Sequence, residues 1–144
     1  MAGRRVAAGG ALVLDSEGLS KLAAGDQRAR AYLETARNRG AKVVVSAIIL
    51  TEVLRGGSRD ALAHRVLSRI TVLPVTPELG REAGELLGRT GLSGHRCAID
   101  AVVAATALEL PRPVLILTSD PDDLNQLVDE LGCAKDQRVA VIHV

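Results

Sequence analysis

Short apolar runs of strand length alternate along this chain with longer segments whose apolar residues recur at helical spacing. The apolar runs cover 11–14, 42–45, 71–75, 114–117 and 139–144. The segments with helical spacing cover 26–39, 46–54, 59–70, 76–87, 98–110 and 122–131. Strands that alternate with helices form a parallel sheet that helices cover on both faces. The sequence therefore predicts an α/β fold, a three-layer α/β/α arrangement around a five-stranded parallel sheet.

The length of 144 residues is that of one domain. We expect a single domain over 1–144, in which residues 1–10 form a loose N-terminal tail. The run 71–75 carries Pro74, which places it at an edge of the sheet. No uncharged run approaches the length of about 18 residues that crosses a bilayer. Two widely spaced cysteines are typical of a reduced protein, so we expect a cytoplasmic location without membrane contact.

Composition excludes two ways of binding nucleic acid. Aromatic residues make up 1% of the chain, a single Tyr, so recognition by stacking of bases on aromatic rings is nearly excluded. The formal net charge is +1, which is not the strongly basic balance of a protein that coats nucleic acid. Local patches of either sign remain compatible with this balance.

Two carboxylates follow strands of the predicted sheet directly. Asp15 comes after the run 11–14, and Asp120 follows 114–117 with Thr118 and Ser119 between. The carboxyl ends of parallel strands meet at one edge of the sheet, where ligands bind in such folds. The alternative is that each Asp only caps the helix that follows it.

Asp100 and Glu52 extend this group of acids. Asp100 is the only charged residue between Cys97 and Leu108, and a carboxylate on an apolar helix face needs a compensating partner. The alternative for Asp100 is a cap on a helix that starts at the next residue. Glu52 lies on an early helix. The alternative to a role in the site is that Glu52 is exposed to solvent and forms an ion pair with Arg55.

Four acids at one crevice would repel one another, and divalent cations with oxygen ligands relieve such repulsion. Two ions about 4 Å apart activate a water and stabilise both oxygens of a phosphodiester displacement. No Ser-His-Asp or Cys-His arrangement and no phosphate-binding glycine loop competes with this hypothesis. The acids therefore favour metal-dependent hydrolysis.

Four segments together resemble a known family. They are Val13-Leu14-Asp15, Thr51-Glu52-Val53, Asp100-Ala-Val-Val-Ala-Ala-Thr-Ala107 and Leu117-Thr-Ser-Asp-Pro-Asp-Asp-Leu124. In this order they are similar to the PIN-domain nucleases, and most of all to the toxin ribonucleases of VapBC-type toxin–antitoxin pairs. The resemblance implies a PIN-like fold, an Mg²⁺- or Mn²⁺-dependent endoribonuclease that hydrolyses RNA, a homodimer, and an antitoxin protein that blocks the acidic site.

The resemblance also assigns roles to residues. Asp15, Glu52, Asp100 and Asp120 match the family's acidic quartet. Asp15, Asp100 and Asp120 would be the metal ligands, and Glu52 would act at the outer shell or on a second ion. Candidates of second rank are a further acid and two hydroxyls beside the acids: Asp123, Ser16 and Thr118. Many relatives carry another acid shortly before the Asp100 position, where this chain has Gly94-His95-Arg96-Cys97. That difference leaves open whether one or two metals bind, and whether Arg96 pairs with Asp100 without metal.

An acidic site needs basic residues beside it to hold phosphates. We expect Arg55 and Arg59 to line the path of the RNA, and the alternative is that these arginines are only solvated. Two other functions remain open at this stage. One is a PIN nuclease of RNA processing or repair, and the other is a PIN-like module that has lost catalysis and only binds partners.

Overall fold

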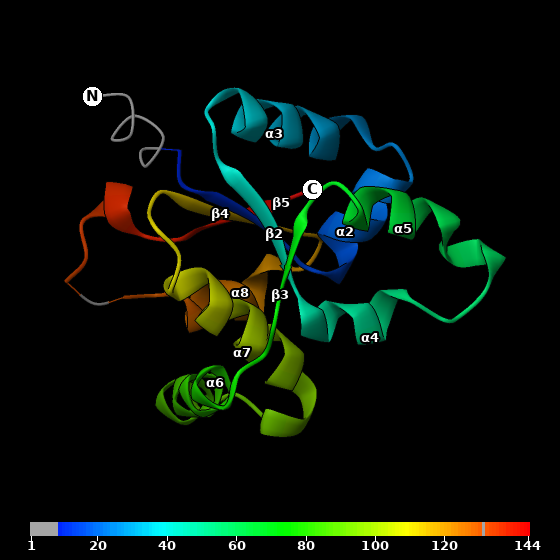
Figure 1. The fold of residues 1–144 in the computed structure, drawn as a ribbon. Coiled ribbons are helices and arrows are strands. Elements are labelled where there is room, and N and C mark those ends of the chain that lie inside the picture. Colours follow the sequence, from blue (N-terminus) through cyan, green and yellow to red (C-terminus); the bar gives the residue numbers. More distant parts are fainter. Residues whose placement is uncertain (1–8, 131) are drawn as a thin grey trace.

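The strands form one parallel sheet in the computed structural model, which describes residues 9–130 and 132–144. The strands are β1 (Ala11–Leu14), β2 (Lys42–Ser46), β3 (Thr71–Leu73), β4 (Val114–Thr118) and β5 (Ala140–His143). Their order across the sheet is β3-β2-β1-β4-β5 (Figure 1). All four pairings are parallel, so the five-stranded sheet is confirmed. The strand order reverses between β1 and β4, which is the switch point where such folds bind ligands.

Helices cover both faces of this sheet, which confirms the three-layer prediction. Helix α3 (Gln27–Asn38) and α2 (Ser16–Ala23) pack on one face, and α5 (Ala61–Leu67) packs against α2. Helix α7 (Gly94–Leu108) and α8 (Pro121–Leu127) cover the other face (Figure 1). Helix α6 (Pro77–Thr90) lies outside α7, and the short α4 (Leu50–Val53) follows β2. None of the described helices is both long and apolar enough to cross a bilayer.

The core is aliphatic and is centred on the three inner strands β2, β1 and β4. All four residues of β1 are buried, and Leu14 pairs in register with Val45 of β2 and Leu117 of β4. Strands buried on both faces appear as continuous apolar runs in a sequence. At the edge, β3 ends at Leu73, before Pro74, so the edge position predicted for this strand is confirmed.

Helices α2 and α7 differ most from the sequence-based prediction, and α8 ends at Leu127 although the predicted helix continued to residue 131. Helix α2 was not predicted, although capping by Asp15 was an alternative considered for this place. Helix α7 begins at Gly94 instead of Ala98, because the Oγ atom of Ser93 accepts a hydrogen bond from the backbone N–H of Arg96. Serine is a favoured residue at this position, since its oxygen satisfies a backbone donor that has no partner in the helix.

The expected tail over residues 1–10 lies mostly outside the described residues. At its end, Gly9 is buried, and the carbonyl oxygen of Gly10 accepts a hydrogen bond of 3.0 Å from the backbone N–H of Lys42. A Cβ atom on Gly9 would lie 2.3 Å from the carbonyl oxygen of Gly40. The chain therefore already lies against the sheet at these two glycines.

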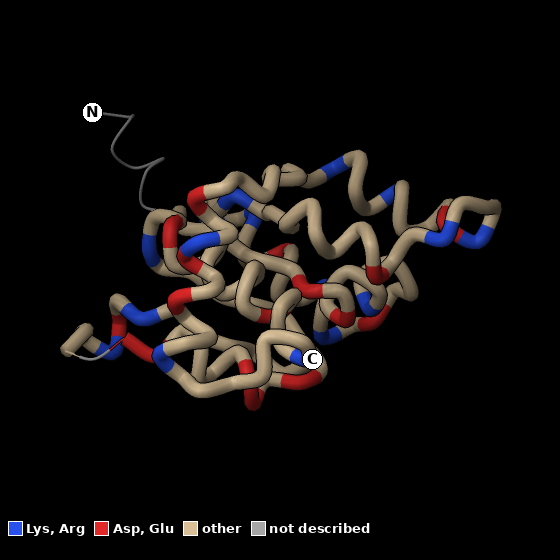
Figure 2. The backbone as a smooth tube through the Cα atoms, turned by 90° about the horizontal axis from the view of Figure 1, so that it is seen from below, with Lys and Arg blue, Asp and Glu red and all other residues tan. Residues whose placement is uncertain are grey.

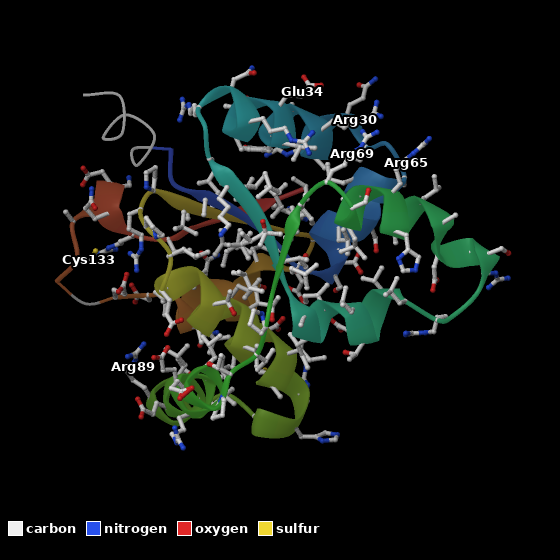
Figure 3. The ribbon with its side chains drawn as sticks, in the orientation of Figure 1. Arg30, Glu34, Arg65, Arg69, Arg89 and Cys133 are labelled. Carbon is white, nitrogen blue, oxygen red and sulfur yellow. The ribbon has the colours of Figure 1, made fainter. Side chains whose placement is uncertain are left out.

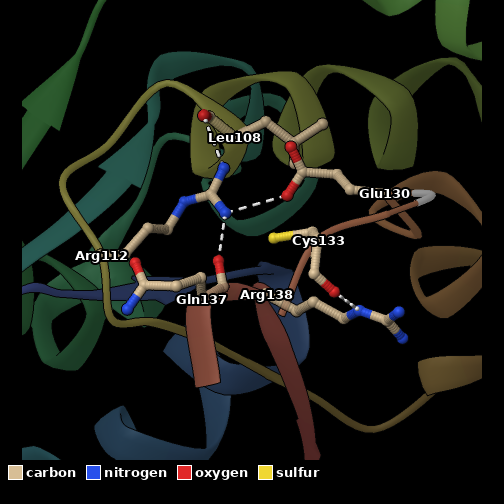
Figure 4. A network of polar contacts seen from close by, with 6 residues as sticks. All are labelled: Leu108, Arg112, Glu130, Cys133, Gln137 and Arg138. Atoms are coloured by element: carbon tan, nitrogen blue, oxygen red, sulfur yellow. Dashed lines mark hydrogen bonds and ion pairs between the residues drawn. The ribbon is translucent and has the colours of Figure 1, made fainter. Parts of the chain in front are cut away.

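Arg112 connects the end of α7 with the segment after α8. Its guanidinium donates hydrogen bonds to the carbonyl oxygens of Leu108, at 3.0 Å, and Gln137 (Figure 4). It also forms an ion pair of 2.8 Å with Glu130. In the same segment, Arg138 donates to the carbonyl oxygen of Cys133. These contacts fix the approach to β5.

A close approach of α2 to β4 depends on Gly18. A Cβ atom there would lie 2.6 Å from the carbonyl oxygen of Leu117. We expect Gly18→Ala to lower the free energy of unfolding by about 1–3 kcal/mol, because α2 must move away from the sheet. Urea denaturation measures this change.

The matched control is Gly84→Ala on α6, where the added Cβ atom meets nothing within 4 Å. Alanine is the better helix former, so this variant should gain about 0.5–1 kcal/mol. Equal stabilities of wild type and Gly18→Ala would contradict the close packing of α2 on β4.

Candidate metal centre

Asp15 lies at the carboxyl end of the central strand and is held from two sides. Its Oδ1 atom accepts a hydrogen bond of 2.8 Å from the backbone N–H of Gly18, so it caps α2. Only 7% of the residue is exposed. Burial raises the pKa of Asp15, and hydrogen bonds from the Thr118 side chain and the Gly18 backbone oppose this effect. Asp15 therefore does cap α2, as the alternative prediction stated, but only its Oδ1 atom takes part in the cap. The residue also lies at the carboxyl edge of the sheet, where ligands bind.

Asp120 reaches the same edge from β4. Leu14 pairs with Leu117 in the sheet, so Asp15 and Thr118 are neighbours across β1 and β4. The buried Thr118 hydroxyl accepts a hydrogen bond of 3.0 Å from the backbone N–H of Asp120. Asp120 stands at the cap position of α8, but its side chain makes no capping bond. Its exposed carboxylate is therefore available to a ligand.

Asp100 lies in the second turn of α7 and receives the negative field of the other acids. Because α7 is capped by Ser93, Asp100 does not cap this helix, and that alternative is excluded. Its pKa is raised from 3.8 to about 6, first by burial and then by the charges of four other carboxylates, which are those of Asp15, Asp123, Glu52 and Asp120. The fold thus brings acids from α2, α4, α7 and α8 into electrostatic contact.

Asp123 and Cys97 add a pair that joins α8 to α7. The Sγ atom of Cys97 lies 3.5 Å from Oδ2 of Asp123 and donates to it. Burial raises the pKa of the Cys97 thiol, and the hydrogen bond to Asp123 raises it further, so the thiol keeps its proton. The sequence pointed to Asp123 but not to Cys97. Its position one helical turn before Asp100 is the signal that places it beside the acids.

Glu52 and Ser16 lie at the margin of this group. Glu52 is exposed on α4 and contributes to the raised pKa of Asp100. The only ion pair among the described residues joins Arg112 and Glu130, so neither the Glu52–Arg55 pair nor the Arg96–Asp100 pair forms. Ser16 is the first residue of α2, and its hydrogen bond to an acid stays a prediction.

The acids suit a hard divalent cation in kind, although they do not form a closed cage. Within residues 9–130 and 132–144, no three His, Cys, Asp or Glu side chains stand close enough to hold one ion. Mg²⁺ keeps several waters and needs only one or two carboxylates directly, so a closed cage is not required. Burial and the negative charges of the neighbouring carboxylates raise the pKa of Asp100, so negative charge is concentrated at this edge. Carboxylate oxygens are the ligands that hard divalent cations prefer, so the donor set fits a cation of this class.

The two arginines expected on the substrate path lie between α4 and α5. Arg55 donates from Nη1 to the carbonyl oxygens of Thr51, at 2.9 Å, and Leu54, at 2.8 Å. The buried Asp60 accepts from the backbone N–H groups of Arg55 and Gly56, which lowers the pKa of Asp60 and fixes this loop. In Figure 2 this loop projects to the right with basic positions at its tip. Arg59 is exposed there.

Comparisons with known proteins agree with the fold. The sequence matches the model of the PIN domain over residues 12–129. Similar solved structures include the crystal structure of VapBC2 from Rickettsia felis bound to a DNA fragment from their promoter. That match has a TM-score of 0.65 at 14% identity and covers 92% of this chain and 98% of the other. No curated protein sequence matches this chain. With its family model matched over most of its length, the chain belongs to the PIN domain family.

Proposed function

We propose that this protein is an Mg²⁺- or Mn²⁺-dependent endoribonuclease and the toxin of a toxin–antitoxin pair. The observation that carries the proposal is the placement of Asp15 and Asp120 just after the paired strands β1 and β4, with Asp100 of α7 within reach of their charges. Proteins of the PIN domain family are generally nucleases, and this chain belongs to that family. The four sequence segments that resemble VapBC-type toxins support the finer assignment.

The hydrogen bonds made by each acid suggest which acids would bind the metal ion directly and which would orient its waters. Asp15 is fixed by the Gly18 N–H and offers its other oxygen as a rigid ligand. Asp100 and Asp120 carry no helix-capping bond and would complete the ligand set. A bound divalent ion supplies a Lewis acid and an activated water for attack on phosphorus. Glu52 and Asp123 would orient waters around that ion, and the Cys97 thiol would hold Asp123 in place.

Partner, substrate and assembly belong to the same proposal. An antitoxin would cover the acidic site, the protein would act as a homodimer in the cytoplasm, and RNA would be the substrate. A small gene directly upstream that encodes a protein able to inhibit cleavage would support the toxin assignment. Its absence, together with RNA cleavage, would favour a PIN nuclease of RNA processing or repair. Light scattering of the purified protein tests the dimer.

The first test is Asp100→Asn. We expect the variant to lose at least about 100-fold in RNA cleavage, because removal of a ligand harms a metal site more than loss of an outer contact does. Cleavage of a fluorogenic RNA with Mn²⁺ or Mg²⁺ measures the rate, and EDTA should abolish it in the wild type. The matched control is Asp122→Asn, which removes an exposed acid in the first turn of α8 that is not among the four carboxylates named as raising the pKa of Asp100.

A variant Asp100→Asn that cuts as fast as the wild type would show that the metal site is assigned wrongly. Failure of the wild type to bind Mn²⁺ at millimolar concentration would favour the partner-binding module instead.

The second test uses the stability of the metal-free protein. The carboxyl of Asp100 titrates at about 6 in the folded chain and has an ordinary value of 3.8. Between these values the folded state holds the proton more tightly than the unfolded state, so the free energy of unfolding falls as the pH rises. Asparagine removes this effect. Above about pH 6 we expect the Asp100→Asn variant to unfold at a higher temperature than the wild type. Its free energy of unfolding should exceed that of the wild type by about 1 kcal/mol, a value that allows for solvent screening of the partly exposed carboxyl.

Below about pH 4 this difference should vanish, because the carboxyl is then uncharged in both states. Mn²⁺ should raise the melting temperature of the wild type more than that of the variant. A variant less stable than the metal-free wild type at neutral pH would contradict the electrostatic origin of the raised pKa. Thermal melts at several pH values in EDTA provide the measurement.

A further inference from the structure

A groove between α3 and α5 carries four arginines whose charges no described acid neutralises by an ion pair. It encloses about 380 Å³, and its basic residues are Arg30, Arg37, Arg65 and Arg69. The only ion pair among the described residues lies elsewhere, between Arg112 and Glu130. Figure 3 shows that Arg30 of α3 points toward the space where Arg65 and Arg69 of the opposite wall lie, with Glu34 on the outer side of α3.

The two walls of the groove repeat the same spacing. On α3, Arg30, Leu33 and Arg37 follow one another at intervals of three and four residues, which places them on one helix face. On the opposite wall, Arg65 and Arg69 lie four residues apart and alternate with Leu62 and Val66. The apolar residues give the arginine stems a surface to lie on, and the charged ends remain in water.

We infer that this groove holds the phosphate backbone of the RNA, as a docking surface next to the metal centre. The inference rests on the proposed function and names the surface that this function lacks. The acid group repels phosphates, so it needs a basic surface to hold the chain beside it. Arg55 is a weak candidate because its guanidinium already donates to the carbonyl oxygens of Thr51 and Leu54. Among the described residues, the guanidinium groups of the groove arginines on α3 and α5, and of Arg69 just after α5, make no such bonds.

The position of the groove fits this role. Leu22 and Gly25 at the C-terminal end of α2 line it, while Asp15 caps the other end of the same helix. Helix α2 has eight residues and is therefore about 12 Å long. A strand of RNA along α2 would meet the guanidinium groups first and the acids next. Guanidinium groups bind phosphate through two parallel hydrogen bonds and do not need aromatic stacking, and no aromatic residue lines this groove.

The test is RNA binding by the full chain in EDTA, where no cleavage occurs. The variant carries Arg65→Gln and Arg69→Gln, and the probe is a fluorescein-labelled single-stranded RNA of mixed sequence. We expect affinity to fall about tenfold and the slope of log affinity against log salt to become shallower by about 1.4, which is two phosphate contacts at 0.7 each. The matched control carries Arg81→Gln and Arg89→Gln on α6, and Figure 3 shows Arg89 far from the groove. The control should bind RNA like the wild type.

Two readouts separate this inference from the proposed function. First, Mn²⁺ binding is measured for the Arg65→Gln, Arg69→Gln variant. If the variant binds Mn²⁺ as tightly as the wild type does, the substitutions have left the acidic site intact. If the wild type fails to cut RNA but its binding still depends on Arg65 and Arg69, the proposed function fails and the groove assignment stands. Unchanged RNA affinity and salt slope in the variant would overturn the assignment. Loss of affinity for a glutamate-rich helical peptide instead would give the groove to an acidic protein partner and overturn it as well.

Discussion

Carboxylates repel one another at the carboxyl edge of the sheet, and the favourable packing of the rest of the fold has to offset this repulsion. The negative charges that act on Asp100 come from α2, α4 and α8, and burial adds to their effect. A chain free to relax would separate such charges. Here the acids stay together because their backbones are fixed by contacts without charge, which are the strand pairing of β1 with β4 and the packing of α7 on the sheet. The apolar core therefore stabilises an electrostatic arrangement that is unfavourable by itself.

Gly18 shows how closely the core and the acids are connected. Its missing side chain lets α2 approach the Leu117 carbonyl, and its N–H donates to Asp15 at the same time. The position of the helix and the orientation of the carboxylate are thus set by one residue. Thr118 plays a similar part from β4, because its buried hydroxyl binds the backbone of Asp120 and lowers the pKa of Asp15. Neutral hydrogen-bond donors thus hold the side chains of Asp15 and Asp123, and a hydroxyl fixes the backbone of Asp120.

The sequence was sufficient for the sheet because buried parallel strands are continuous apolar runs, and it placed Asp15 and Asp120 at one edge because they follow such runs directly. It was not sufficient for α2, where Asp15, Ser16 and Gly18 are residues typical of turns and the packing of the helix against β4 and α5 adds to the cap from Asp15. The start of α7 was missed for a similar reason, since Ser93 and Gly94 are typical of loops. Cys97 was not a candidate because its role depends on Asp123, which lies 26 residues further along the chain.

Although the formal net charge is only +1, positive and negative side chains are concentrated near opposite ends of α2. Acids gather at its N-terminal end, and four arginines line the groove at its C-terminal end. The arginines attract a polyanion and the acids repel it. An RNA strand would therefore be held in the groove, next to the acids but not in contact with them. A divalent ion lowers the negative charge of the acidic region, because its two charges offset two of those on the carboxylates. Metal binding would then act on more than the attacking water, since it would also open the acidic edge to a strand already held by the arginines.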